Sequence, residues 1–381
     1  MRAILVIVVV LWLVTSPSSA DALNLGLAEA VQASYVDIAV PGYSIPSFVD
    51  WNSDGVCDLI VGEGSGTLPA KVRVYINYGS AAAPFFVTHF YVQSNGSDLV
   101  VVGGGCQGAC PRVVYWDADG NKDLLVGQAD GTLKLFTNIG TDTAPTFDGG
   151  TLLQVGIPGS QVDITVAARA NPVVVDWDSD GRRDLVVGAL DGKIHIFLNV
   201  GTDTEPLYLT EALAQSQGAD LVVPTARSSP AVLDIDGDGM KDLLSGNTEG
   251  NLVFYSNLGT NTAPYFGDYE LIESDGVPID LAGTPRSRPS VCYWSTDDDI
   301  LDVLIGSVDG MVRLYQGVAQ TGDLNCDGFV NAYDIDPFIC AVSPNCDFES
   351  IYGCQRMLGD CNGDGDVNAY DIDSFIALVG R

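Results

Sequence analysis

The stretch Asp176-Trp-Asp-Ser-Asp-Gly-Arg-Arg-Asp-Leu-Val-Val-Gly188 decides the fold, because most of the chain is built from variations of it. Carboxylates stand at its positions 1, 3, 5 and 9, and a glycine stands at position 6. Such charges repel one another, since two unit charges ~4 Å apart cost about 4 kcal/mol at an effective dielectric of about 20. Ca²⁺ relieves this repulsion, because it takes about six to eight oxygen ligands and accepts a backbone carbonyl at position 7. We therefore interpret the stretch as a calcium loop that leads into a buried strand.

The same unit recurs along the chain. Its copies cover residues 46–62, 111–127, 172–188, 231–246 and 289–306, and the fifth is degraded. The residues at loop position 1 are separated by 65, 61, 58 and 59 residues; they are Asp50, Tyr115, Asp176, Asp234 and Tyr293. A period near sixty in an all-β pattern indicates propeller blades or an array.

Within each period the strand signals follow the same order. In the third copy a β-branched run, Val173–Val175, leads into the loop, and a second run, Leu185–Val187, leaves it. The dipeptide Asp191-Gly192 is typical of a hairpin turn and opens a third strand over Lys193–Leu198. A polar corner over residues 199–206 then precedes a fourth strand. Four strands per unit, five units and no helical periodicity predict an all-β fold, a five-bladed β-propeller of four-stranded blades.

The two ends of the repeat region predict how the ring closes. Residues Leu23–Val40 resemble a fourth strand, whereas the fifth copy stops after its third strand at Met311–Tyr315. We expect the N-terminal strand to complete the last blade and so remove an exposed sheet edge.

The first twenty residues have the layout of a secretory signal: Arg2, an apolar run over residues 3–14, and small residues up to Ala20. The run is too short to span a bilayer, although a retained N-terminal anchor is the alternative. We expect a signal peptide over residues 1–20, a propeller over 21–316, a linker over 317–322 and a second domain over 323–381. The mature protein is then secreted, extracellular or at a cell surface.

The composition narrows the classes of partner. Lys and Arg total 17 against 50 Asp and Glu, for a net charge of −33, which argues against nucleic acids and anionic lipid surfaces. Nine cysteines in an exported chain predict disulfides with at least one thiol left over. Cys106 and Cys110 can pair locally or form a loose zinc half-site, and the sequence does not fix the connectivity.

After the linker, two twelve-residue loops share one pattern. Residues 323–334 and 360–371 place oxygens at positions 1, 3, 5, 9 and 12 and a glycine at position 6, as in EF-type calcium loops. Each runs into a similar short helix, at Ile335–Ile339 and Ile372–Ile376, with one apolar face. We expect a small α-helical domain that binds two calcium ions.

This region resembles a dockerin, the duplicated half-EF-hand module that docks onto a cohesin. The resemblance covers residues 323–381 and implies a cohesin-like scaffold or surface protein as partner. In that family the side chains at loop positions 10 and 11 help to select the partner; the matching residues here are Ala332, Tyr333, Ala369 and Tyr370. The chain departs from the family in a cysteine-bearing insert, Cys340–Cys354, and in Pro337 of the first helix.

The repeats resemble FG-GAP or VCBS-type propeller repeats, whose calcium loops also occur in integrin heads. The resemblance is most specific in copies one, three and four, where the acidic ligand set is complete. It implies calcium binding and a role in adhesion or recognition, although a fold alone fixes no function.

We expect Ca²⁺ in the complete loops, leave copy two open because Tyr115 replaces its first ligand, and expect no ion in copy five. The alternative is an acidic Asp-Gly turn that binds nothing. The expected ligands are, in copy one, Asp50, Asn52, Asp54, Val56 and Asp58; in copy two, Asp117, Asp119, Asn121 and Asp123; in copy three, Asp176, Asp178, Asp180, Arg182 and Asp184; in copy four, Asp234, Asp236, Asp238, Met240 and Asp242; in the first C-terminal loop, Asp323, Asn325, Asp327, Phe329, Asn331 and Asp334; in the second, Asp360, Asn362, Asp364, Asp366, Asn368 and Asp371.

Four tryptophans stand at loop position 2: Trp51, Trp116, Trp177 and Trp294. A ring of indoles can stack on sugars, but copy four has Ile235 at this position, which favours packing between blades.

No catalytic residue can be assigned. His89 and His195 lie in strand-like runs without a nucleophile signature. The leading hypothesis is a secreted calcium-binding protein whose propeller recognises a glycan or protein and whose C-terminal domain tethers it to a scaffold or cell surface. The alternative is an extracellular polysaccharide-degrading enzyme, a glycoside hydrolase or lyase, with its acid pair in the propeller.

Overall fold

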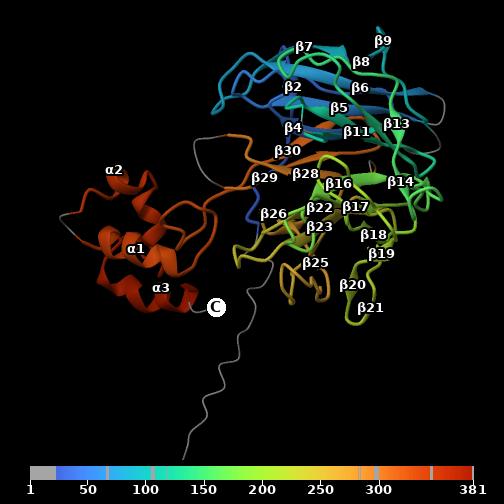
Figure 1. Ribbon diagram of the computed structural model, residues 1–381. Helices are drawn as coiled ribbons and strands as arrows, with labels where there is room; N and C mark the ends of the chain where they lie inside the picture. The colour runs from blue at the N-terminus through green and yellow to red at the C-terminus, as the bar shows by residue number, and fades with distance from the viewer. Residues whose placement is uncertain are drawn as a thin grey trace, which may run out of the picture.

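The computed structural model describes residues 23–65, 68–103, 108–117, 119–281, 283, 285–295, 300–343 and 346–379. It is mostly β, with five antiparallel four-stranded blades and a few short C-terminal helices, which confirms the predicted fold class (Figure 1). From the inner to the outer edge, the blades are β4 (Ile45–Val49), β5 (Asp58–Ser65), β6 (Leu68–Asn77) and β7 (Phe86–Tyr91); β10 (Cys110–Val114), β11 (Asp123–Gly127), β12 (Leu133–Phe136) and β13 (Thr151–Leu152); β16 (Asn171–Val175), β17 (Asp184–Gly188), β18 (Ile194–Phe197) and β19 (Ala212–Leu213); β22 (Ser229–Leu233), β23 (Asp242–Gly246), β24 (Leu252–Tyr255) and β25 (Glu270–Leu271); β28 (Arg288–Cys292), β29 (Asp302–Gly306), β30 (Val312–Tyr315) and β1 (Glu29–Ala30).

The ring closes through the N-terminal strand, as predicted. Strand β1 pairs antiparallel with β30, with Glu29 opposite Leu314 and Ala30 opposite Arg313. The five inner strands contact one another in sequence, and β28 contacts β4 to complete the circle. A buried apolar cluster lies at each of the five blade interfaces, so blade one packs on blade five as it does on blade two.

Short hairpins latch each blade to the next, a feature that the repeat pattern did not reveal. They are β2 (Gln32–Ala33) with β3 (Val36–Asp37), β8 (Gln93–Ser94) with β9 (Ser97–Asp98), β14 (Gln154–Val155) with β15 (Val162–Asp163), β20 (Gln215–Ser216) with β21 (Ala219–Asp220), and β26 (Glu273–Ser274) with β27 (Val277–Pro278). In the blade-one hairpin, the Phe147 N–H of blade two donates to Gln93 O at 3.2 Å. Asn95 N–H donates back to Phe147 O at 2.9 Å.

The loop tryptophans pack between blades, as the sequence favoured. Trp51 and Trp177 are buried, and their rings lie 5.9 Å from Phe147 and Phe266 of the following blades. In blade four the equivalent Ile235 shares its cluster with Leu25, an aliphatic residue where the other interfaces have an aromatic ring. The exception to the tryptophan pattern is therefore matched by a smaller partner.

The glycine that ends each motif allows the next blade to approach. A Cβ on Gly188 would lie 2.5 Å from Ser228 O of the following blade, and one on Gly246 would lie 2.2 Å from Ser287 O. The same contact recurs at Gly62, Gly127 and Gly306. No side chain fits at this distance, so the motif's last position encodes the spacing between blades.

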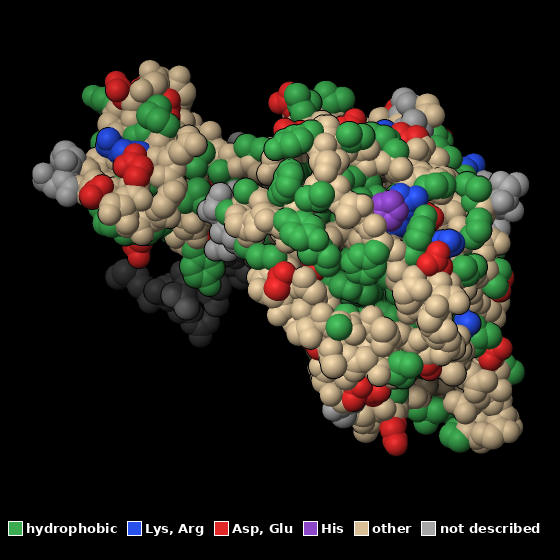
Figure 2. Space-filling model, turned by 90° about the horizontal axis from the view of Figure 1, so that it is seen from above, with side chains coloured by type: hydrophobic (Ala, Val, Ile, Leu, Met, Phe, Trp, Pro, Cys, Tyr) green, Lys and Arg blue, Asp and Glu red, His purple; other side chains and the backbone are tan. Residues whose placement is uncertain are grey.

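The C-terminal segment from residue 323, here called the tail, forms a second lobe beside the propeller (Figures 1 and 2). Its elements are η2 (Ala332–Asp334), α1 (Ile335–Ala341), α2 (Phe348–Tyr352), η3 (Arg356–Gly359), η4 (Ala369–Asp371) and α3 (Ile372–Val379). Phe338 of α1 and Phe375 of α3 occupy equivalent places in the two sequence copies and stack with ring centroids 4.0 Å apart. Disulfides join Cys326 to Cys354 and Cys340 to Cys346.

The described part of the chain contains no helix long and apolar enough to cross a membrane. Acidic side chains are scattered singly over the face in Figure 2, with few Lys or Arg among them.

Candidate metal centres

The acidic loops connect the inner strand of each blade to the second strand, so they gather at the end of the ring where the inner strands finish. In copy three, Asp176 Oδ2 accepts the Gly181 N–H at 3.0 Å, and Asp180 Oδ1 accepts the Arg182 N–H at 2.9 Å. Copies one and four repeat both bonds. The loop backbone thus holds the carboxylates at positions 1 and 5 in place, and Gly181, with φ 87°, supplies the turn that a side chain would strain.

The aspartate at position 9, or its equivalent one residue later in copy five, fastens the loop to the sheet in all five copies. Asp184 Oδ2 accepts the Trp177 N–H at 2.8 Å, and its Oδ1 accepts the Asn199 N–H at 2.7 Å. Asp58, Asp123 and Asp242 make the same pair of bonds. Asp302 of the degraded fifth copy does so too, with Trp294 and Gly317 as donors. Position 9 therefore has a structural role that does not depend on a complete ligand set.

Two loops bring three carboxylates together. Oxygens of Asp176, Asp178 and Asp184 lie within 4.8 Å of one another, as do those of Asp234, Asp236 and Asp242. Asp178 Oδ1 is buried and has no hydrogen-bond partner among the described residues. An unpartnered buried oxygen beside two further carboxylates fits a cation, and an all-oxygen donor set is the one that Ca²⁺ prefers. These clusters can therefore hold a metal ion.

The electrostatics of the clusters also fit a cation. Burial raises the pKa of Asp184 to about 6, and Asp178 and Asp180 add to the shift by repulsion. Burial raises the pKa of Asp242 to about 7, with a further contribution from Asp236. These carboxylates are costly to ionise in the absence of a positive charge, and a bound cation would remove that cost.

Copies one and two differ from this arrangement. In copy one an amide replaces the carboxylate at position 3, and the amide of Asn52 donates to Asp54 Oδ2 at 2.9 Å. As in copy three, burial raises the pKa of the aspartate at position 9, here Asp58, to about 6. In copy two Tyr115, which replaces the first ligand, donates through its hydroxyl to Asp142 at 3.1 Å. The three remaining carboxylates of copy two do not form such a cluster among the described residues. Ion binding in copies one and two stays a prediction; residues 296–299 of copy five lie outside the described residues.

Two groups of supporting residues were missed by the sequence reasoning. The N–H at loop position 8 donates to a side chain of the polar corner: Lys122 to Asp142, Arg183 to Asp203, and Lys241 to Asn261, at 2.6 to 2.8 Å. The ammonium groups of Lys122 and Lys241 also reach the preceding blade's loop, at Ser53 and Ser179. The recurrence of Asp or Asn at one place in three of the four corners was the available signal.

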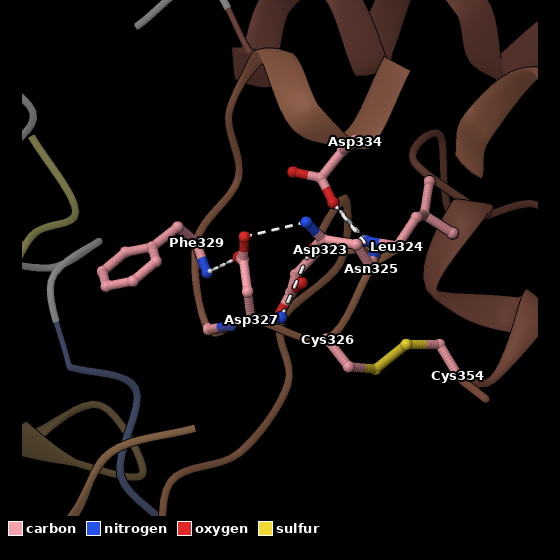
Figure 3. The surroundings of a disulfide bond; sticks show 9 residues. Asp323, Leu324, Asn325, Cys326, Asp327, Phe329, Asp334 and Cys354 are labelled. Atoms are coloured by element: carbon pink, nitrogen blue, oxygen red, sulfur yellow. Dashed lines mark hydrogen bonds between the residues drawn. A yellow bond between two sulfur atoms is a disulfide. The ribbon is translucent and has the colours of Figure 1, made fainter. Parts of the chain in front are cut away.

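The first tail loop has the same hydrogen-bonded arrangement as the blade loops (Figure 3). Asp323 Oδ2 accepts the Gly328 N–H at 3.0 Å, and its Oδ1 is buried without a hydrogen-bond partner among the described residues. Burial raises the pKa of Asp323 to about 7, with repulsion from Asp334 and Asp327. Asp334, at position 12, accepts the Leu324 N–H at 2.6 Å and so takes the part that position 9 plays in the blades.

The second tail loop has the same bonds, since Asp360 Oδ2 accepts the Gly365 N–H at 2.8 Å and Asp371 Oδ1 accepts the Asn362 N–H at 3.1 Å. The orphaned Asp323 oxygen makes the first tail loop fit a cation. The positions 10 and 11 expected to contact a partner, Ala332, Tyr333, Ala369 and Tyr370, are all exposed.

Comparisons with known proteins bear mainly on the repeats. Among solved structures, a GH43_1 enzyme from Xanthomonas citri superposes with a TM-score of 0.45 at 11% identity, covering 78% of this chain and 92% of that one. BBS1N in its complex with ARL6DN gives a TM-score of 0.35 at 13% identity, covering 78% and 97%. No curated protein sequence matches the chain. Residues 176–245, from the loop of blade three to β23, match the model of the FG-GAP-like repeat, so the chain carries this repeat within a five-bladed propeller.

Proposed function

We propose that the protein is a secreted, calcium-binding recognition protein. Its propeller, over residues 21–316, binds a glycan or protein ligand, and its dockerin-like tail, over residues 323–381, tethers it to a cohesin-like scaffold or surface protein. Residues 1–20 act as the signal peptide and 317–322 as the linker. Ca²⁺ in the blade and tail loops stabilises the fold, because an ion that binds the folded state alone shifts the folding equilibrium towards it.

The observation that carries the proposal is the duplicated apolar surface of the tail. Tyr333 and Tyr370, at loop position 11 of the two copies, are 79% and 82% exposed. The next helical turns expose two further matched pairs, Ile335 with Ile372 and Ile339 with Ile376. Exposed apolar residues in a contiguous set mark interaction sites, and matched sets around the stacked Phe338 and Phe375 suit a partner that can dock in either of two orientations.

Recognition is favoured over hydrolysis by the lining of the central channel. The channel is a cavity of about 230 Å³ lined from all five inner strands. Its described lining residues are apolar or serine, with Arg112 as the charged member. A glycoside hydrolase needs two carboxyl groups about 5 to 9.5 Å apart on either side of the bond that it cleaves. A catalytic propeller, hydrolase or lyase, remains the second candidate that the experiment must address.

Surface plasmon resonance against immobilised cohesin-type proteins tests the tether, with the full chain in Ca²⁺ or EGTA. Tyr333→Ala or Tyr370→Ala alone should leave binding within about tenfold, since the other copy can still dock. The double variant should lose at least about thirtyfold, as expected for buried aromatic anchors. Tyr78→Ala removes a tyrosine that is 65% exposed on the propeller and serves as the matched control. Calcium-independent binding, or no binding to any cohesin-type protein, would refute the tether.

A glycan array probed with the calcium-loaded chain tests the propeller, and assays of sugar release from the same polysaccharides test the rival. Saturable binding without product formation supports recognition. Turnover by the wild-type protein would establish the enzyme instead.

A further inference from the structure

Five arginines gather at the end of the central channel opposite the acidic loops. Each inner strand begins with a residue followed by proline, and three of these strands are preceded by an arginine at the same place, three residues before the proline. Two more arginines lie on the inner strands themselves. Together the channel arginines are Arg112, Arg169, Arg227, Arg286 and Arg288.

The three arginines at the equivalent position share an unusual backbone. Arg169, Arg227 and Arg286 have φ of 59°, 63° and 74°, in the left-handed region that non-glycine residues seldom adopt. Such conformations are strained and persist where the surroundings impose them, often at ligand sites. The repeated loop thus holds three guanidinium groups at matching places around the ring.

The charges act on one another. Arg288, the first residue of β28, is 3% exposed, and burial lowers its pKa to about 10. The charges of Arg227, Arg169 and Arg286 lower it further, so these groups lie close enough to repel. Arg286 donates to the hydroxyl of Tyr43, which stands at the equivalent place in blade one. The cluster therefore spans the ring.

Four of these arginines lack the carboxylate partners that the other arginines of the propeller have among the described residues. Four arginines outside the cluster form ion pairs: Arg73 with Glu63, Arg182 with Asp180, Arg183 with Asp203, and Arg313 with Asp309. Among the described residues, no carboxylate forms an ion pair with Arg112, Arg227, Arg286 or Arg288, in a chain with 50 Asp and Glu.

Two guanidinium nitrogens in the cluster are left without an acceptor. Arg227 Nη1 and Arg286 Nε are buried and have no hydrogen-bond partner among the described residues. Neither side chain is fully buried, so each of these two arginines combines a buried donor with an accessible flank. Unpaired buried charge is strongly unfavourable, and an acceptor that carries negative charge would satisfy both the donors and the charge.

We propose that this end of the channel binds an oxyanion: a carboxylate, sulfate or phosphate, free or borne by a larger ligand. Guanidinium groups bind oxyanions through paired N–H donors. An anion placed among several guanidinium groups also offsets the repulsion between them. The adjoining cavity of about 230 Å³ is lined by Arg112 and the inner strands and suits a small acidic group. The site uses neither the tail nor the acidic loops, so a test of this site is independent of a test of the tether.

Thermal-shift and calorimetric titrations of the calcium-loaded full chain, in a chloride buffer of low ionic strength, test the proposal. The probes are sulfate, phosphate and galacturonate, with neutral galactose as the control. At least one oxyanion should stabilise the protein saturably, and galactose should not; the preferred probe distinguishes an inorganic anion from an acidic sugar.

Arg227→Gln and Arg286→Gln should each weaken binding at least about tenfold, because each removes charge-assisted donors. The double variant should abolish it. Lys71→Gln, which removes a partly exposed charge paired with Asp98 on blade one, should bind as the wild type does. Equal affinity in the arginine variants, or no saturable effect of any oxyanion, would overturn the proposal. If the double variant fails to fold, a selenate-soaked crystal of the wild type decides, since the ion must lie between Arg227 and Arg286.

Discussion

Replacing Asp178 by alanine should change the stability of the propeller in opposite directions with and without calcium. The Oδ1 of Asp178 is buried and has no hydrogen-bond partner among the described residues, and one carboxylate oxygen of Asp178 lies within 4.8 Å of oxygens of Asp176 and Asp184. Without an ion, each such neighbour repels it by about 3 kcal/mol at an effective dielectric of about 20, which is an upper bound because the loop is partly exposed. Removing the charge should then raise the free energy of unfolding by about 1 kcal/mol in EGTA.

With calcium the sign reverses. An ion present at about 100 times its dissociation constant stabilises the folded state by about 2.7 kcal/mol, and the variant forfeits this. For a domain of this size 1 kcal/mol shifts the melting temperature by about 2 °C, so we expect a decrease of about 5 °C in calcium and a small increase in EGTA.

The assay is differential scanning calorimetry of the two proteins in both buffers, with two controls. Asp268→Ala removes an exposed charge outside the loops and should have little effect. Asp176→Ala also removes the acceptor of the Gly181 and Asp180 N–H groups, so it should destabilise in both buffers. If Asp178→Ala were equally destabilising with and without calcium, the cluster would not be an ion site.

Three further predictions concern stability. Asp302→Ala should lower the free energy of unfolding by about 2 to 4 kcal/mol in both calcium and EGTA, because the N–H groups of Trp294 and Gly317 lose their acceptor. Urea titration measures this loss, and a loss seen only in calcium would contradict a structural role. Trp177→Ala should lower the free energy of unfolding by about 3 to 5 kcal/mol, because it leaves a cavity against Phe266, whereas Trp177→Phe should lower it by less. Equal losses of the two variants in urea titrations would argue against a packing role for Trp177. Gly246→Ala should lower the melting temperature by more than Gly276→Ala, since a Cβ at residue 246 meets Ser287 O at 2.2 Å while one at residue 276 meets nothing within 4 Å. A larger decrease for Gly276→Ala would rule out the argument that Gly246 sets the spacing between blades.

Much of the propeller follows from the sequence because each blade repeats the same local rules. The acidic loop, the buried strand and the hairpin turn are contiguous, so their spacing alone predicted the blade count and the strand order. Ring closure was also predictable, since a fourth strand was missing at one end and present at the other. Ile235 revealed the role of the tryptophans, because a sugar platform would not tolerate an aliphatic residue.

Features built from several blades were not predictable in the same way. Asp184 is a carboxylate of the motif, and nothing in the motif says that both its oxygens hold backbone N–H groups of other segments. Arg227 and Arg286 lie almost sixty residues apart in unremarkable loops, and they become one cluster only when the blades close into a ring. Aligning the repeats on the prolines of the inner strands would have shown the shared arginine position.

The most direct test of the calcium account is the number of ions that stay with the folded full-length protein after dialysis into calcium-free buffer, counted by mass spectrometry of the metal content. The account predicts one calcium ion for each complete loop, in blades one, three and four and in both tail loops, and a lower melting temperature of both lobes once EGTA removes them. Less than one ion per chain, with melting unchanged by EGTA, would contradict it.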